Sequence, residues 1–329
     1  MNSSVRFGVC LFPTQFISPE TDPLESARAI FGAAQLAETC GLDSYWVIDH
    51  LLTAADRYRH PVFEPLTLLT ALAARTGRIR LGTSILILPL RDPVLTAKQL
   101  ATMDALSGGR IIVGAAAGWA KEEFDASGIP FEARGKRFDE QLAVMKKLWT
   151  EDDVTFTGDY FSFSNVTIDP KPWQKPHIPL WIGAENVAIN APFRRIARFG
   201  DGWLGVTSPR HYVEGLSKIA TFARSVGRDP STIEHANFTY TMVDDDGEAA
   251  RRKGLQTLAG IHSEPIMQNV QKLLVAGSPS EVVKKIENQI RAGVRYVILN
   301  LVTSDPDVIT LVAEKVIPNI DVDIAVQSG

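Results

Sequence analysis

An acidic residue and a histidine stand side by side at Asp49 and His50, directly after the apolar stretch 43–48. That stretch predicts a buried strand, so the pair would lie at the carboxyl end of the strand. Histidine exchanges protons near neutral pH, and a carboxylate beside it can orient the ring. We therefore predict that Asp49 and His50 are catalytic as a general acid–base pair. A purely structural histidine is the alternative.

A second cluster, Gly82, Thr83, Ser84 and Ile85, interrupts the otherwise apolar run 79–87. Glycine inside a buried strand marks a bulge or the close approach of another molecule. The cluster is thus a candidate ligand site, and tight packing inside the protein is an equal alternative.

A third cluster combines Gly183, Ala184 and Glu185 with the later residues Gly200 and Asp201. Small residues between a strand and a helix leave backbone N–H groups free at the helix N-terminus, an arrangement that suits phosphate. An ordinary turn is the alternative reading. The six histidines lack metal-ligand spacing such as His-x-x-x-His, so we predict no metal site.

The stretch 79–119 contains the elements that must position these residues. Its apolar run 79–87 predicts a strand buried on both faces. Asp92 and Pro93 open a helix over 94–106, and Gly108 and Gly109 end it. Residues 110–114 form a second strand, which completes a βαβ unit with both strand ends on one rim.

The same alternation extends along the chain. We predict eight strands, each followed by helix, over residues 5–12, 43–48, 79–87, 110–114, 177–182, 202–206, 234–243 and 294–299. Eight such units favour an α/β fold of the (β/α)8 TIM-barrel type, with the site at the carboxyl ends of its strands. Residues 120–132 are predicted as a loop. We predict one domain over 1–329, with an insertion at 152–175 after the fourth-strand region that contains a hairpin turning at 158–159.

Composition narrows the class of protein. The chain has 329 residues, of which 45% are hydrophobic, and a net charge of −4. This balance argues against binding to nucleic acid or an acidic membrane surface, and no apolar run reaches the roughly 18 residues of a membrane helix. The two cysteines are typical of buried thiols in a reduced compartment, so we expect a cytoplasmic protein. The sequence carries no G-x-S-x-G, P-loop or H-E-x-x-H motif. The residue patterns therefore predict a barrel enzyme that binds a phosphate-bearing ligand. They do not identify the class of reaction.

Several segments together resemble one known family. They are SYWVIDH (44–50), RIRLGTSILILPLRDPVLTAKQLATMDALSGGR (78–110), GAAAGW (114–119), RGKRFDEQL (134–142), LW…F.GDYF (148–161), PLWIGA (179–184) and FGDGW (199–203). In this order they resemble the bacterial luciferase-like superfamily of flavin- and deazaflavin-dependent oxidoreductases, closely over 7–205 and loosely beyond. The resemblance implies a TIM-barrel enzyme with an insertion near the middle. It also implies a homodimer built on the helices after the second and third strands.

The resemblance also implies where a cofactor would lie. The flavin-type ring would rest on a bulge with a non-prolyl cis peptide, which falls at Ser84-Ile85. Its phosphate would bind the turn at Gly183-Ala184. The full set of implied cofactor-binding residues is Gly82, Thr83, Ser84, Ile85, Ala117, Trp119, Gly183, Ala184, Glu185 and Asp201. The implied substrate-pocket residues are Tyr58 and Phe12.

Two branches of the superfamily remain as alternatives. The segment GAAAGW with the Asp-His pair looks more like the branch that uses the deazaflavin coenzyme F420 for hydride transfer to or from a small organic substrate. The runner-up is a monooxygenase that uses reduced FMN from a separate flavin reductase and inserts oxygen from O2. A third reading is a cofactor-free binding barrel. Some deazaflavin dehydrogenases carry a glutamate where this chain has Trp119, so either Glu122 or Glu123 substitutes, or His50 alone exchanges the proton.

Overall fold

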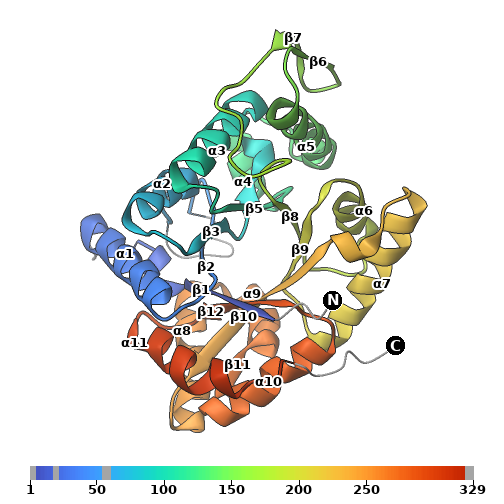
Figure 1. Cartoon of the computed structure of the whole chain (residues 1–329). Helices are drawn as coiled ribbons and strands as arrows, with labels where there is room; N and C mark the ends of the chain where they lie inside the picture. Colours follow the sequence, from blue (N-terminus) through green and yellow to red (C-terminus); the bar gives the residue numbers. More distant parts are fainter. Residues whose placement is uncertain (1–4, 18–21, 54–60, 323–329) are drawn as a thin grey trace.

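The computed structural model describes residues 5–17, 22–53 and 61–322, and in them the predicted barrel is confirmed (Figure 1). The strands pair in parallel from β1 around to β10, and the ring closes because β12 pairs with both β10 and β1. The eight barrel strands are β1 (Arg6–Leu11), β2 (Ser44–Val47), β3 (Arg80–Thr83), β5 (Ile111–Ala116), β8 (Leu180–Ala184), β9 (Gly202–Gly205), β10 (Glu234–Val243) and β12 (Tyr296–Leu301).

Two short strands accompany the barrel. β4 (Leu86–Ile87) follows the interruption after β3 and pairs with β5. β11 (Val275–Gly277) pairs with the upper part of β10, beyond the end of β9. β11 is not among the eight strands predicted from the sequence. With three residues, it is too short to show a period-two pattern.

Helices surround the sheet in the outer layer that a parallel barrel requires (Figure 1). They are α1 (Pro23–Thr39), α2 (Pro65–Arg75), α3 (Pro93–Ser107), α4 (Lys121–Ala126), α5 (Arg134–Thr150), α6 (Asn190–Phe199), α7 (Pro209–Ser225), α8 (Gly247–Ile261), α9 (Glu264–Leu273), α10 (Pro279–Arg291) and α11 (Asp307–Leu311). The prediction of a loop over 120–132 was wrong in part, because α4 lies within this segment. Across the described ranges, none of the helices has the length and apolar character needed to cross a bilayer. Homodimer formation through α2 and α3 stays a prediction.

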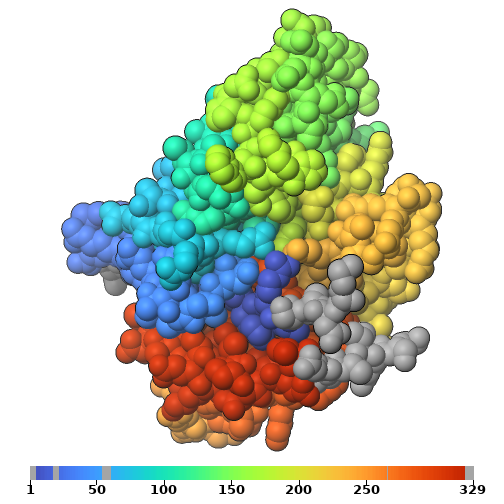
Figure 2. Space-filling view, viewed as in Figure 1, coloured from blue at the N-terminus to red at the C-terminus, as the bar shows by residue number. Residues whose placement is uncertain are grey.

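The predicted hairpin is present outside the barrel. β6 (Val154–Thr157) and β7 (Ser162–Val166) form a separate antiparallel pair, which protrudes at the top of Figures 1 and 2. Glu140 of α5 fixes its turn by accepting hydrogen bonds from the backbone N–H groups of Asp159, Tyr160 and Phe161. The domain bounds 1–329 and the insertion bounds 152–175 remain our proposal.

Large aromatic side chains fill the inside of the barrel. The rings of Trp46 and Trp181 lie 5.4 Å apart, and Tyr296 packs edge-on against Trp181 at 4.9 Å. All three side chains are almost fully buried. Because this interior is packed, ligand sites are expected at the rim of the barrel.

Candidate active site

A cavity of about 470 Å³ lies at the carboxyl ends of the strands. It is bounded by the interruption between β3 and β4, by the end of β5 and by the end of β8. Seven of the predicted cofactor residues line it, namely Ser84, Ile85, Ala117, Trp119, Gly183, Ala184 and Glu185. The structure therefore brings together residues that lie about a hundred positions apart in the sequence.

The interruption after β3 forms one wall of this cavity. The peptide bond between Ser84 and Ile85 is cis, as the resemblance implied. The Ser84 N–H donates to the carbonyl of Val47 on β2 over 2.7 Å. On its other side, Ile85 lies close to Gly183 of β8, whose missing side chain leaves room for it. Ile85 thus presents an apolar side chain to the cavity.

Gly82 and Thr83, also predicted as cofactor-binding residues, are not among the residues that line this cavity. A Cβ atom on Gly82 would stand 2.4 Å from the ring of Trp46, so this glycine makes room for the packed interior. The Thr83 hydroxyl donates to the carbonyl of Gly114 over 2.8 Å and is buried. Both residues serve the packing of the strands.

Substituting Gly82 with alanine should destabilise the fold by about 1–3 kcal/mol, because overpacking forces the Trp46 ring to move. The matched control is Gly32→Ala in α1, where an added Cβ meets nothing within 4 Å. The control should be neutral or stabilising by up to about 1 kcal/mol. Urea unfolding measures both, and equal stabilities for the two variants would contradict this reading of Gly82.

His50 lies beside the cavity and contacts a buried carboxylate. Its ring atom Nδ1 is 3.1 Å from Oε1 of Glu123, and the His50 ring packs edge-on against the cavity residue Trp119 at 5.5 Å. Since a carboxylate only accepts hydrogen bonds, Nδ1 is the donor. Proton exchange with a substrate would therefore use the other ring nitrogen, Nε2.

Glu123 is fully buried and fixed by the chain around His50. Its Oε1 also accepts hydrogen bonds from the N–H groups of Leu51 at 2.7 Å and Leu52 at 3.2 Å. Its Oε2 is buried and has no hydrogen-bond partner within the described ranges. α4 supplies this residue to the site. A carboxylate with this burial and these contacts can fix both the tautomer and the orientation of a histidine ring.

Asp49, predicted as a catalytic partner of His50, contacts Arg91 and the backbone of Ile87. Its carboxylate accepts two hydrogen bonds from Arg91, at 2.8 and 3.1 Å, and one from the N–H of Ile87 at 2.8 Å. Burial raises the pKa of the Asp49 carboxyl above its usual range, although Arg91 favours the charged form. Arg91 also contacts Glu64 at the start of α2. Asp49 therefore ties the end of β2 to β4 and the segment after it.

Two arginines, which were not predicted as site residues, also line the cavity, together with Glu132 and Glu185. Arg134 is fixed by bonds from its guanidinium to the carbonyls of Gly118 and Phe131, and it stacks on the Phe131 ring at 3.8 Å. Arg195 lies nearby, but Asp139 neutralises it in a two-point ion pair. Arg134 with the backbone at Gly183 and the start of α6 could hold a phosphate. The motif RGKRF, noted only for resemblance, was the available signal.

Asp201, predicted as a cofactor residue, lies at the opposite end of the barrel from the cavity. It precedes β9, and its carboxylate accepts a hydrogen bond from the N–H of Leu180 at the beginning of β8. Lys146 and His177 lie beside it at 3.5 and 3.6 Å. A helix-to-strand connection necessarily lies at the amino ends of the strands, away from the site.

Phe12 lines a smaller neighbouring cavity of about 160 Å³. This space shares Ser84, Glu185 and Phe238 with the larger one, so a substrate could extend into it. Tyr58, the other predicted substrate-pocket residue, lies outside the described residues. Within the described part of the chain, no three His, Cys, Asp or Glu side chains gather as a metal site.

The family follows from a comparison with known sequence families. Residues 5–296 match the family described as luciferase-like monooxygenase. The chain belongs to this family. The expectation drawn from the sequence motifs is thereby confirmed at the level of the family.

Relatives within the family use two kinds of cofactor. The chain is 28% identical to an F420-dependent glucose-6-phosphate dehydrogenase of Amycolatopsis mediterranei, over 89% of this chain and 94% of the relative. It is 35% identical to an FMNH2-dependent dimethylsulfone monooxygenase of Pseudomonas putida, over 50% of this chain and 45% of the relative. Among solved structures, a monooxygenase from Streptomyces bottropensis superposes with a TM-score of 0.82 and 26% identity, over 95% of this chain and 99% of that one. The chain is thus a flavin- or deazaflavin-type oxidoreductase by family.

Proposed function

We propose that this family member transfers a hydride between the deazaflavin coenzyme F420 and a small organic substrate, with His50 as the acid–base residue. The observation that carries the proposal is the contact between His50 and the buried carboxylate of Glu123 beside the cavity. Removing a hydride from an alcohol carbon requires that the hydroxyl proton leave, and reduction of a carbonyl requires a proton in return. A fixed histidine supplies this exchange.

The residues around the cavity fit a ring with a phosphate-bearing tail. Ile85 and the small residues Ala116 and Ala117 leave an apolar wall for the ring, while Gly183 and Arg134 would hold the phosphate. When bound, a deazaflavin supplies hydride transfer with negligible oxygen chemistry. The chain itself would orient the ring and hold the proton at His50.

A reduced-FMN monooxygenase supplied by a separate flavin reductase is the second candidate. The observations in its favour are the 35% identity to the Pseudomonas putida enzyme and the structural similarity to the Streptomyces bottropensis monooxygenase. Against it, the segment Gly114–Gly118 contains only glycine and alanine. It therefore offers no side-chain amide near the ring edge. The relative affinities of the chain for the deazaflavin and for FMN would distinguish the two candidate functions.

Replacing Glu123 with glutamine should remove the fixed tautomer of His50 and lower turnover by about 10²-fold, the lower end of what acid–base catalysis contributes. Glutamine can still accept hydrogen bonds from Leu51 and Leu52, so the surrounding loop should be retained. Nitrogen-15 NMR of the His50 ring should show Nδ1 protonated in the native chain. The variant should lose this preference.

The matched control is Glu122→Gln, which removes the same charge from the exposed neighbour on α4. It should leave both the His50 ring signals and turnover unchanged. A Glu123→Gln variant that behaves like this control would refute the role of Glu123.

A further inference from the structure

The smaller cavity of about 160 Å³ is almost entirely apolar. Its walls come from the carboxyl ends of the barrel strands and from helix α9. All of its lining residues are apolar or aromatic except Ser84, Glu185 and Asn269. A cavity with such walls and few polar groups is typical of a site for a small organic molecule, and its lining indicates the class of that molecule.

Three aromatic rings form the wall on the side of the barrel. Phe12 and Tyr240 meet edge-on with their ring centres 5.7 Å apart, and Tyr240 meets Phe238 edge-on at 6.4 Å. His262 at the end of α8 stacks on the ring of Phe12 at 5.8 Å. All three rings are buried. Because these rings pack against one another, the wall is already formed before a molecule binds.

Helix α9 supplies another wall with one of its faces. Ile266, Val270 and Leu273 line the cavity. They are spaced four and three positions apart, which places them on the same face of a helix. This apolar face is therefore directed at the cavity, where a bound apolar molecule would cover it.

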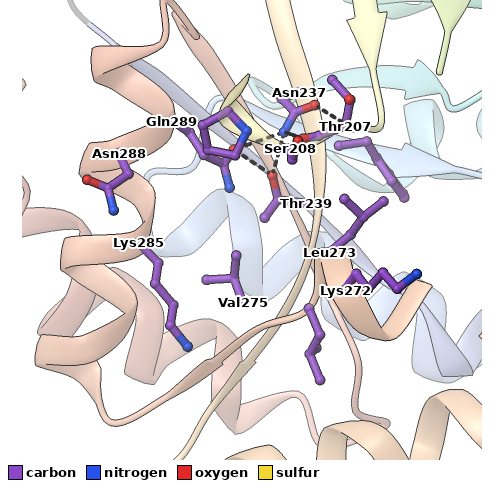
Figure 3. A pocket seen from close by; sticks show the side chains of 13 residues that line it. Thr207, Ser208, Asn237, Thr239, Lys272, Leu273, Val275, Lys285, Asn288 and Gln289 are labelled. Atoms are coloured by element: carbon purple, nitrogen blue, oxygen red, sulfur yellow. Dashed lines mark hydrogen bonds between the residues drawn. The ribbon is translucent and has the colours of Figure 1, made fainter. Parts of the chain in front are cut away.

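The cavity offers no positive charge to a ligand. Among the described residues that line it, Glu185 is the only charged one. Lys272 of α9 instead lines a separate polar cavity of about 170 Å³ beside β10, together with Asn237 and Gln289 (Figure 3). An anionic group in the smaller cavity would lose its water and meet apolar walls and a carboxylate, which is costly. The molecule that fits is uncharged.

The polar side chains lie mainly at the border with the main cavity. Ser84 and Glu185 line both cavities. The residues that line only the smaller one are apolar or aromatic except for Asn269, which is exposed. A bound molecule would therefore keep its reacting polar group beside the proposed ring wall at Ser84, and its apolar body under α9.

The volume limits the size of this apolar body. An apolar cavity of about 150 Å³ inside a protein can hold one benzene molecule. The smaller cavity, with about 160 Å³, has room for a body of similar size. One six-membered ring would fill it.

We propose that the substrate is an uncharged alcohol, or the corresponding carbonyl compound, that carries one six-membered apolar ring in this cavity. The reaction rests on the proposed function, whereas binding of the ring does not. In the direction of oxidation, the carbinol C–H bond breaks and its hydride passes to the oxidised deazaflavin. The hydroxyl proton passes to Nε2 of His50, and the carbonyl compound is left.

The test is an NMR titration of the whole chain with three alcohols, namely 1-phenylethanol, 2-propanol and mandelate. 2-Propanol has a methyl group in place of the ring, and mandelate has a carboxylate in place of the methyl group of 1-phenylethanol. We expect 1-phenylethanol to bind about 10- to 100-fold more tightly than 2-propanol, because the ring is removed from water. Mandelate should bind at least about tenfold more weakly than 1-phenylethanol. With deazaflavin present, kcat/KM should follow the same order.

Variants of α9 locate the bound ring. Val270→Phe should weaken binding of 1-phenylethanol about tenfold or more, because the added ring occupies the cavity. Ile266→Phe repeats the test at a half-buried position, where a larger side chain disturbs the fold less. The matched control is Gln268→Phe on the same helix, since Gln268 is exposed and does not line the cavity. This control should bind 1-phenylethanol like the native chain.

Equal affinities for 1-phenylethanol and 2-propanol would overturn the proposal, as would tighter binding of mandelate. Native affinity in both Val270→Phe and Ile266→Phe would also overturn it, because the ring would then lie elsewhere. If 1-phenylethanol binds as expected but the chain binds no deazaflavin, the proposed function fails and the ring site stands. If the chain with deazaflavin turns over 2-propanol or mandelate faster than 1-phenylethanol, the substrate class fails and the proposed function stands.

Discussion

Replacing His50 with alanine should lower turnover by about 10²–10⁴-fold, the contribution typical of a positioned acid–base residue. Affinity for the cofactor should change little, because we assign Nε2 of His50 to proton exchange with the substrate and not to cofactor binding. Turnover is measured as the change in deazaflavin absorbance with a panel of alcohols and their carbonyl products. Cofactor affinity is measured in parallel by fluorescence.

The control is His177→Gln, since His177 lies near Asp201 at the amino ends of the strands. This variant should keep native turnover. If His50→Ala retains native turnover as well, His50 is not the acid–base residue. If it instead loses cofactor affinity without a change in the bound rate, its role is in binding.

Replacing Arg91 with alanine should destabilise the protein by about 3–5 kcal/mol, the cost of leaving one member of a buried ion pair without its partner. The Asp49 side chain is 1% exposed, and its carboxylate accepts two hydrogen bonds from Arg91. Urea unfolding monitored by tryptophan fluorescence measures the loss. The joint variant Asp49→Asn with Arg91→Met should regain much of the stability, because it removes both charges.

The matched control for this prediction is Lys147→Ala. Lys147 pairs with Glu151 on the surface, where both side chains are about half exposed. An exposed pair contributes at most about 1 kcal/mol. A similar small loss in Arg91→Ala would contradict the structural role of Asp49.

The sequence predicted the barrel because its strands are buried apolar runs separated by helices with clear starts and stops. It also placed Ser84-Ile85, Gly183-Ala184 and His50 at the rim, because the carboxyl ends of parallel strands share one face. The carboxylate of Asp49 contacts Arg91 and not the ring of His50, because successive side chains along an extended chain point to opposite sides. Neighbours in sequence are for that reason poor partners at the end of a strand.

Glu123 shows a different limit of prediction from the sequence. It contacts His50 from 73 positions away, and the segment around it was predicted as a loop. Glu122 and Glu123 were both named as substitutes for the glutamate of related dehydrogenases. Only the folded structure distinguishes them, because a six-residue helix buries one and exposes the other. Arg134 was missed for a similar reason, since its contacts with Gly118 depend on how the chain returns after β5.

The most direct test of the proposed function is a fluorescence titration of the purified chain with the deazaflavin coenzyme F420 and with oxidised and reduced FMN. We predict tight binding of the deazaflavin and weak binding of both forms of FMN. Tight binding of reduced FMN with weak binding of the deazaflavin would contradict hydride transfer and favour the two-component monooxygenase. Binding of none of them would favour the cofactor-free barrel.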